Sequence, residues 1–178
     1  MRFQFVERLI SRQRTGCWLV ALMLSLGSTA TLAAPRQAAL VIDGNTGAVL
    51  HNRDGDSARY PASLTKMMTL YLVFEQLEQG RLTMASRILV SASAADAAPS
   101  KLGLDAGTSI MLGDLVKAII VKSANDMAVA VAEHIGGSED KFAALMTEKA
   151  RALGMRQTTF KNASGLPHDE QVTTARDM

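Results

Sequence analysis

The chain of 178 residues is 48% hydrophobic and 20% charged, the composition of a globular protein of about one domain. Of its 19 basic and 17 acidic residues, four arginines and one glutamate precede an apolar run near the N-terminus, so the rest of the chain carries a net charge of −1. This balance excludes nucleic acid as a partner, because a nucleic-acid-binding protein shows a basic face or stripe. A single cysteine excludes a disulfide framework, and three histidines without ligand spacing predict no metal site.

The N-terminus has the three-part pattern of a secretory signal peptide. Four arginines come first, Cys17–Leu26 is an uninterrupted apolar run, and small residues follow as far as Ala34. We expect a signal peptide over residues 1–34, cleaved next to Ala33 or Ala34. The alternative is an uncut membrane anchor, although the apolar run is shorter than the roughly 20 residues that span a bilayer. Export predicts a periplasmic protein, or one at the extracytoplasmic face of the cytoplasmic membrane.

The first elements after this leader are a hairpin and a helix. Two short apolar runs within residues 38–52 flank Asp43–Gly47, whose glycines and asparagine favour a tight turn, so we expect a β-hairpin. Pro61 then opens a helix that Gly80 ends. Apolar residues surround most of this helix, which predicts burial on most sides. A short extended piece is expected over residues 87–91.

Three more helices are expected in the second half of the chain. Asp114 caps the first, over residues 115–122, and the second covers residues 125–135. Ser138 caps the third, over residues 139–153. At the end, Thr173 and Thr174 are typical of a helix N-cap. We therefore expect a fragment, because the sequence stops as a helix begins.

Ser63 and Lys66 are the first candidate catalytic pair. They are three residues apart at the start of the predicted helix and therefore share a face. A serine hydroxyl needs a base to become a nucleophile, and a lysine serves as that base only when burial or nearby positive charge lowers its pKa. The N–H of Ser63, in the first turn, is free to help form an oxyanion hole. The competing interpretation is a capping serine followed by a surface lysine.

Ser123 and Asn125 form the second candidate pair, about sixty residues later. They lie at the junction of two predicted helices, where serine and asparagine often serve only as caps. Here they follow the apolar residues 119–121, so we expect the junction to be buried. A buried hydroxyl and amide need hydrogen-bond partners, which the Ser63–Lys66 pair and a substrate amide would supply.

Ser-x-x-Lys followed by Ser-x-Asn, after a signal peptide, is a known order of catalytic elements. The chain resembles the penicillin-binding D-alanyl-D-alanine carboxypeptidases of low molecular mass, the serine DD-peptidases that trim peptidoglycan. The resemblance covers most of the mature chain. It is carried by AALVIDGNTGAVL, YPASLTKMMTLYLVFEQLEQGRL, KSANDMAVAVAEHIGGSEDKFAALMTEKARALGM and TTFKNASGLPHDEQVTTARDM, in this order.

The resemblance implies an α/β fold of the β-lactamase/DD-peptidase (transpeptidase-like) type, an antiparallel sheet with packed helices. Residues 35–178 would be an incomplete catalytic domain whose C-terminal strands are missing. Ser63 resembles the nucleophile, Lys66 its proton acceptor and Ser123 the serine that relays protons to the leaving amine. Asn125 resembles the amide that binds the substrate backbone. The implied substrate is a peptidoglycan pentapeptide, β-lactams are covalent inhibitors, and no cofactor or metal is needed.

The family also carries a third element, Lys-Thr-Gly, on a later strand, and no lysine of this chain begins such a triplet. Activity of the chain as given is therefore in doubt, and an inactive truncated remnant is one alternative. A class A β-lactamase is another, but no glutamate after Ser123 lies in the Glu-x-x-Leu-Asn setting of that family. The sequence does not separate a carboxypeptidase from an endopeptidase. The resemblance also leaves open a membrane association through a missing C-terminal segment.

Overall fold

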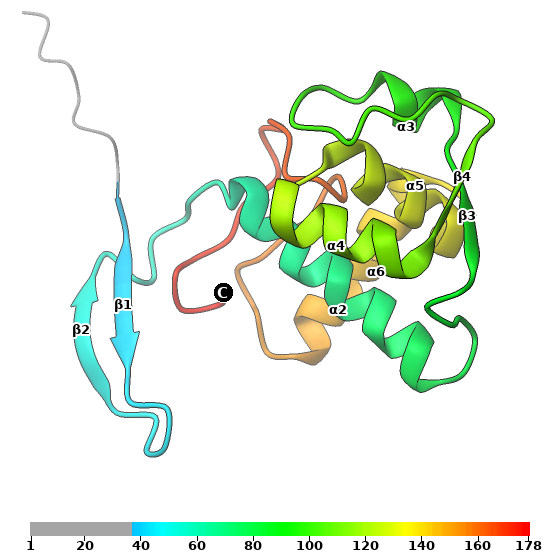
Figure 1. The fold of residues 1–178 in the computed structure, drawn as a ribbon. Helices are drawn as coiled ribbons and strands as arrows, with labels where there is room; N and C mark the ends of the chain where they lie inside the picture. The colour runs from blue at the N-terminus through cyan, green and yellow to red at the C-terminus, as the bar shows by residue number, and fades with distance from the viewer. Residues whose placement is uncertain (1–36) are drawn as a thin grey trace, which may run out of the picture. The chain divides into compact units, whose positions relative to one another are not determined.

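The computed structural model describes residues 37–178, and the predicted signal peptide over residues 1–34 lies outside them. Two antiparallel strand pairs, β1–β2 and β3–β4, accompany a set of packed helices (Figure 1). The elements in chain order are β1 (Ala39–Ile42), β2 (Val49–Arg53), the 3-10 turn η1 (Ala62–Leu64), α2 (Thr65–Glu78), β3 (Arg87–Leu89), α3 (Ala92–Asp96), β4 (Ser109–Met111), α4 (Leu112–Lys122), α5 (Asn125–Gly136) and α6 (Glu139–Ala152).

The predicted hairpin is confirmed, and its turn is built around one aspartate. The Asp43 carboxylate accepts hydrogen bonds from the backbone N–H groups of Asn45 and Thr46, and from the Thr46 hydroxyl. Gly47, at φ +72°, closes the turn by donating its N–H to the Asp43 carbonyl. All five residues of β2 are exposed to solvent. The turn is therefore held by hydrogen bonds among residues 43–48, all of them local in sequence.

Helix α5 is the centre of the hydrophobic core. Its residues from Asn125 to Ala132 are all buried, and it packs against α2, α3, α4, α6 and β3. This packing fixes the positions of α2 and α5, the two helices at whose starts the candidate residues lie. The largest fully buried apolar side chains around α5 are Phe142, Ile88, Leu112, Leu115, Met127 and Met146.

Helix α2 is buried on one face only, so the expectation of burial on most sides is wrong. Met68, Leu72 and Val73 face the core. On the opposite face Met67 and Phe74 are exposed. Apolar composition measures how much surface a helix is able to bury, but burial also requires a neighbouring element. Within residues 37–178 no element covers this face of α2.

The ends of the other helices agree with the sequence except at one point. Ser138 caps α6 as expected, its hydroxyl accepting the Lys141 N–H at 3.3 Å. Helix α4 begins at Leu112, directly after β4, so Asp114 lies inside its first turn and is not the N-cap. The Asp114 carboxylate instead pairs with Lys117 at 3.0 Å. Thr174 caps one turn at the end of the chain by accepting the N–H of Asp177.

Among residues 37–178, every helix falls short of the length and apolar character that a membrane span requires. The same residues contain no cluster of three or more histidine, cysteine or carboxylate side chains placed to hold a metal ion.

Phe142 and Phe74 offer a matched test of the core. Phe142 is 0% exposed and Phe74 is 45% exposed, so the same truncation removes packing at only one of them. Phe142→Ala should lower the free energy of unfolding by about 3–5 kcal/mol, whereas Phe74→Ala should change it by less than about 1 kcal/mol. Urea denaturation measures both values. Equal losses would contradict the assignment of the core to the α5–α6 side of the helices.

Candidate active site

Ser63 lies on a tight turn directly before α2. Pro61 precedes the turn with a helical φ of −70°, and Ser63 is the middle residue of η1. Ala62 has φ +46°, a left-handed conformation that non-glycine residues seldom adopt. Such strain costs roughly 1–2 kcal/mol and persists where the surroundings enforce it, often at functional sites. The serine is thus on a 3-10 turn, not on the α-helix that the sequence predicted.

Lys66 is buried in the first turn of α2, with only 4% of its surface exposed. Its Nζ lies 3.4 Å from the Ser63 Oγ, a long hydrogen bond, and 2.5 Å from the carbonyl oxygen of Ser164. Burial lowers the pKa of the Lys66 amine, because the charged ammonium loses hydration. The predicted proximity of the two side chains is confirmed. The alternative of a surface lysine is wrong.

The segment Ala163–Gly165 forms the other side of this pair. The Ser164 carbonyl accepts from Lys66, and the Ala163 carbonyl accepts from the hydroxyl of Thr69 on α2. Gly165 has φ +85°, and a Cβ built on it would lie 1.9 Å from the Ala62 carbonyl oxygen. No candidate residue was predicted in this segment, because a backbone carbonyl has no sequence signature. The glycine was the one available signal.

Ser123 and Asn125 lie at the junction of α4 and α5. Ser123 is the C-cap of α4 in a left-handed conformation, with φ 56° and ψ 39°. The junction is less buried than expected, because Ile120 and Val121 are 60% and 85% exposed and Ser123 is half-buried. Asn125 is buried as predicted.

The loop that precedes β4 makes hydrogen bonds to Asn125 and Asp126 at this junction. The Asn125 amide donates to the Ala98 carbonyl at 2.9 Å, and its backbone N–H donates to the Ser100 carbonyl at 2.7 Å. The buried Asp126 carboxylate accepts the N–H groups of Leu102 and Gly103. The Asn125 amide nitrogen thus has a partner within the chain, the Ala98 carbonyl.

The structure therefore joins the candidate residues in two pairs. Ser63 contacts Lys66 directly, whereas Ser123 and Asn125 share a helix junction. Within residues 37–178 no hydrogen bond links one pair to the other. Both pairs lie where a helix begins, and those two helices, α2 and α5, pack against each other. The positive end of a helix dipole suits a carbonyl oxygen that becomes negatively charged.

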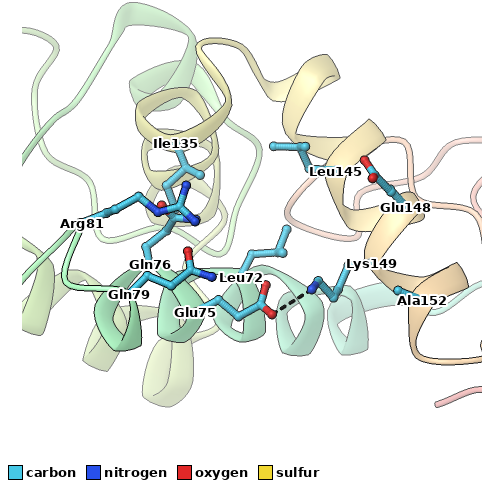
Figure 2. A pocket seen from close by; sticks show the side chains of 10 residues that line it. All are labelled: Leu72, Glu75, Gln76, Gln79, Arg81, Ile135, Leu145, Glu148, Lys149 and Ala152. Atoms are coloured by element: carbon cyan, nitrogen blue, oxygen red, sulfur yellow. Dashed lines mark hydrogen bonds and ion pairs between the residues drawn. The ribbon is translucent and has the colours of Figure 1, made fainter.

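A separate hollow of about 370 Å³ lies farther along α2, between this helix, the end of α5 and α6. Figure 2 shows the ion pair between Glu75 and Lys149 at its side, with a separation of 2.8 Å. Glu75 is nine residues from Lys66, which is about 13 Å along a helix. The hollow contains none of the four candidate residues and is distinct from the candidate site.

Comparison with known proteins identifies the family of this chain. A family model described as D-alanyl-D-alanine carboxypeptidase matches residues 27–178. Among curated proteins, D-alanyl-D-alanine carboxypeptidase DacF of Bacillus subtilis is 37% identical over 150 residues, which are 84% of this chain and 39% of that protein. A D-alanyl-D-alanine endopeptidase of Pseudomonas aeruginosa is 31% identical and matches over 90% of this chain and 55% of its own length.

The solved structures agree in fold. The carboxypeptidase DacD of Francisella tularensis superposes with a TM-score of 0.77 at 39% identity, covering 83% of this chain and 36% of that chain. Penicillin binding protein 5 of Haemophilus influenzae gives a TM-score of 0.75 at 36% identity, covering 81% of this chain and 44% of that chain. The fold is thus the transpeptidase-like fold of the penicillin-binding DD-peptidases, as predicted.

The chain belongs to the D-alanyl-D-alanine carboxypeptidase family. It spans about two fifths of the length of the Bacillus relative.

Gly165 and Gly154 provide a matched test of the contact beside Ser63. Both have a left-handed φ, +85° and +86°, but a Cβ at Gly154 would meet nothing within 4 Å. Gly154→Ala should cost about 1–2 kcal/mol of unfolding free energy, the cost of that conformation. Gly165→Ala should cost more, because its methyl group also overlaps the Ala62 carbonyl. Chemical denaturation measures the difference, and equal costs would contradict the close approach.

Proposed function

We propose that the protein is an exported serine-type D-Ala-D-Ala carboxypeptidase that removes the terminal D-alanine from peptidoglycan stem peptides. The observation that carries the proposal is the buried Lys66 amine, 3.4 Å from the Ser63 hydroxyl, with a pKa lowered by burial. A neutral amine at this position is a competent base for a serine nucleophile. Membership of the carboxypeptidase family supports the choice of substrate.

In the first half of the reaction, Ser63 Oγ attacks the carbonyl carbon of the penultimate D-alanine as Lys66 Nζ takes the hydroxyl proton. The negative oxygen of the tetrahedral intermediate is stabilised by N–H donors, among them the N–H of Ser63. The bond to the terminal D-alanine then breaks. The leaving amine receives a proton through the hydroxyl of Ser123, while Asn125 binds the backbone of the peptide.

In the second half, water attacks the ester on Ser63, which releases the shortened peptide and restores the serine hydroxyl. A β-lactam enters the same sequence when Ser63 opens its ring and becomes acylated. Structures of penicillin-binding proteins among the similar folds support this inhibitor class. The predicted signal peptide over residues 1–34 supports export to the compartment that holds peptidoglycan.

The second candidate function is cleavage of peptide cross-links, which the similarity to a D-alanyl-D-alanine endopeptidase favours. The acyl transfer to Ser63 is the same, and only the leaving group differs. A comparison of D-alanine release from a pentapeptide with cleavage of a cross-linked muropeptide dimer separates the two functions. Faster pentapeptide trimming supports the carboxypeptidase, and faster dimer cleavage supports the endopeptidase.

A class A β-lactamase would differ in deacylation. We expect bound penicillin to be released slowly, because no glutamate after Ser123 lies in the setting that activates the deacylating water. Penicillin hydrolysis by the full-length protein is followed by absorbance. Rapid turnover would contradict the DD-peptidase assignment.

Ser63→Ala should abolish release of D-alanine from a peptide ending in D-Ala-D-Ala, because the acyl-enzyme then has no oxygen on which to form. Lys66→Ala should lower the rate by about 10²–10⁴-fold, the usual contribution of a general base. Ser109→Ala, at an exposed serine of β4, serves as the control and should leave the rate unchanged. Persistent release by the Ser63 variant would overturn the choice of nucleophile.

The lowered pKa of Lys66 predicts a pH dependence of acylation. The neutral amine is the base, so the acylation rate of penicillin should rise with pH as Lys66 loses its proton. The rate should level off at a lower pH than that at which an exposed lysine titrates, about 10.4. Lys66→Arg keeps the charge but cannot lose it, so this variant should be inactive throughout. A rate that is flat or falls with rising pH would argue against Lys66 as the base.

A further inference from the structure

The segment Ala163–Gly165 is linked on one side to the candidate site and on the other to α6. Its link to the site consists of the Ser164 and Ala163 carbonyls, which accept from Lys66 and Thr69. Its link to α6 is the Ala163 N–H, which donates to the Glu139 carboxylate at 2.9 Å. One residue of the segment is thus held from both directions through its backbone.

Glu139 combines a position at the N-terminus of a helix with partial burial. It is the first residue of α6 and is half-buried, and burial raises the pKa of its carboxyl group, with the nearby charges of Glu133 and Asp140 adding to the effect. A carboxylate here is therefore less favourable than one in water. Its hydrogen bond to Ala163 is the interaction that offsets this cost.

The helix dipole alone does not account for the contact that Glu139 makes. Acidic residues in the first turn of a helix are stabilising, and α6 has two of them, Glu139 and Asp140. Asp140 is exposed to solvent and supplies this dipole interaction at no desolvation cost. Unlike Asp140, Glu139 contacts the segment Ala163–Gly165, which in turn contacts Lys66.

We propose that Glu139 is a positioning residue for acylation: by accepting the Ala163 N–H, it holds the Ser164 carbonyl where that carbonyl receives the Lys66 amine. This inference rests on the proposed function, since it concerns the base of the same reaction. Glu139 does not touch the reacting atoms and acts through the backbone of the segment. Glu139 supplies an acceptor oxygen on a side chain long enough to reach the Ala163 N–H, and its charge is not required.

Three substitutions of Glu139 separate the effect of side-chain length from the effect of charge. Glu139→Gln keeps the acceptor oxygen at the same reach and removes the charge. Glu139→Asp keeps the charge but shortens the side chain by one carbon, and Glu139→Ala removes both. Asp140→Ala is the control, because it removes a carboxylate from the same helical turn without touching the segment.

The experiment measures acylation of the full-length protein by a fluorescent penicillin, with the acylation rate constant separated from the dissociation constant of the initial complex. We expect Glu139→Ala and Glu139→Asp to lower the rate constant by about 10- to 100-fold, the effect of a misplaced catalytic group, with the dissociation constant unchanged. Glu139→Gln and Asp140→Ala should remain within about threefold of the unsubstituted protein. The denaturation midpoint of Glu139→Gln should equal or exceed that of the unsubstituted protein, since the substitution removes a half-buried charge.

The outcomes distinguish this inference from the proposed function. If the unsubstituted protein is not acylated, the proposed function fails. If it is acylated and Glu139→Asp reacts at the unsubstituted rate, only the positioning role fails. A Glu139→Gln rate as low as that of Glu139→Asp would also overturn the proposal, because an acceptor oxygen at the right reach would then not be sufficient without the charge. This comparison stands even if Glu139→Ala does not fold.

Discussion

The burial of one amine is the constraint on which the rest of the site depends. Lys66 lies between the Ser63 hydroxyl and the Ser164 carbonyl, so three positions spread over about a hundred residues of sequence must converge on one nitrogen. Burial disfavours the ammonium form of such a lysine, and this is what makes the amine useful as a base. The strained φ of Ala62 and the close approach of Gly165 are found beside the same group. Strain, burial and a chemically useful pKa therefore occur together at this point.

The contacts that build this site belong to the helical part of the chain. The Ser63–Lys66 pair is held by the start of α2, by the segment Ala163–Gly165 and by the N-terminus of α6. Neither the β1–β2 hairpin nor the exposed face of α2 makes any of these hydrogen bonds around Lys66 and the segment Ala163–Gly165. Large exposed apolar surfaces in soluble proteins usually mark interfaces, and the Bacillus relative is more than twice as long as the part that this chain matches. The geometry of the base thus depends on the helical core and not on those surfaces.

The sequence predicted local features well and distant contacts poorly. The hairpin, the helix ends at Gly80 and Ser138, and the proximity of Ser63 to Lys66 follow from turn chemistry, capping and helical spacing. The exposed face of α2 could not be predicted, because apolar periodicity does not reveal whether a partner element is present. The Ser164 carbonyl could not be predicted either, since every residue carries one and only tertiary structure brings this one to Lys66. The hydrogen bond from the Asn125 amide to the Ala98 carbonyl could not be predicted for the same reason.

Peptide mapping after reaction with penicillin tests directly whether Ser63 is the nucleophile. The full-length protein is incubated with benzylpenicillin, digested with trypsin and analysed by mass spectrometry. Cleavage after Arg59 and Lys66 gives the peptide YPASLTK, which contains Ser63. We expect this peptide to gain the mass of one penicillin, fragmentation to place the added mass on Ser63, and Ser63→Ala to prevent the addition. An adduct on any other residue, or none in a folded protein, would contradict the assignment of Ser63 and Lys66 as nucleophile and base.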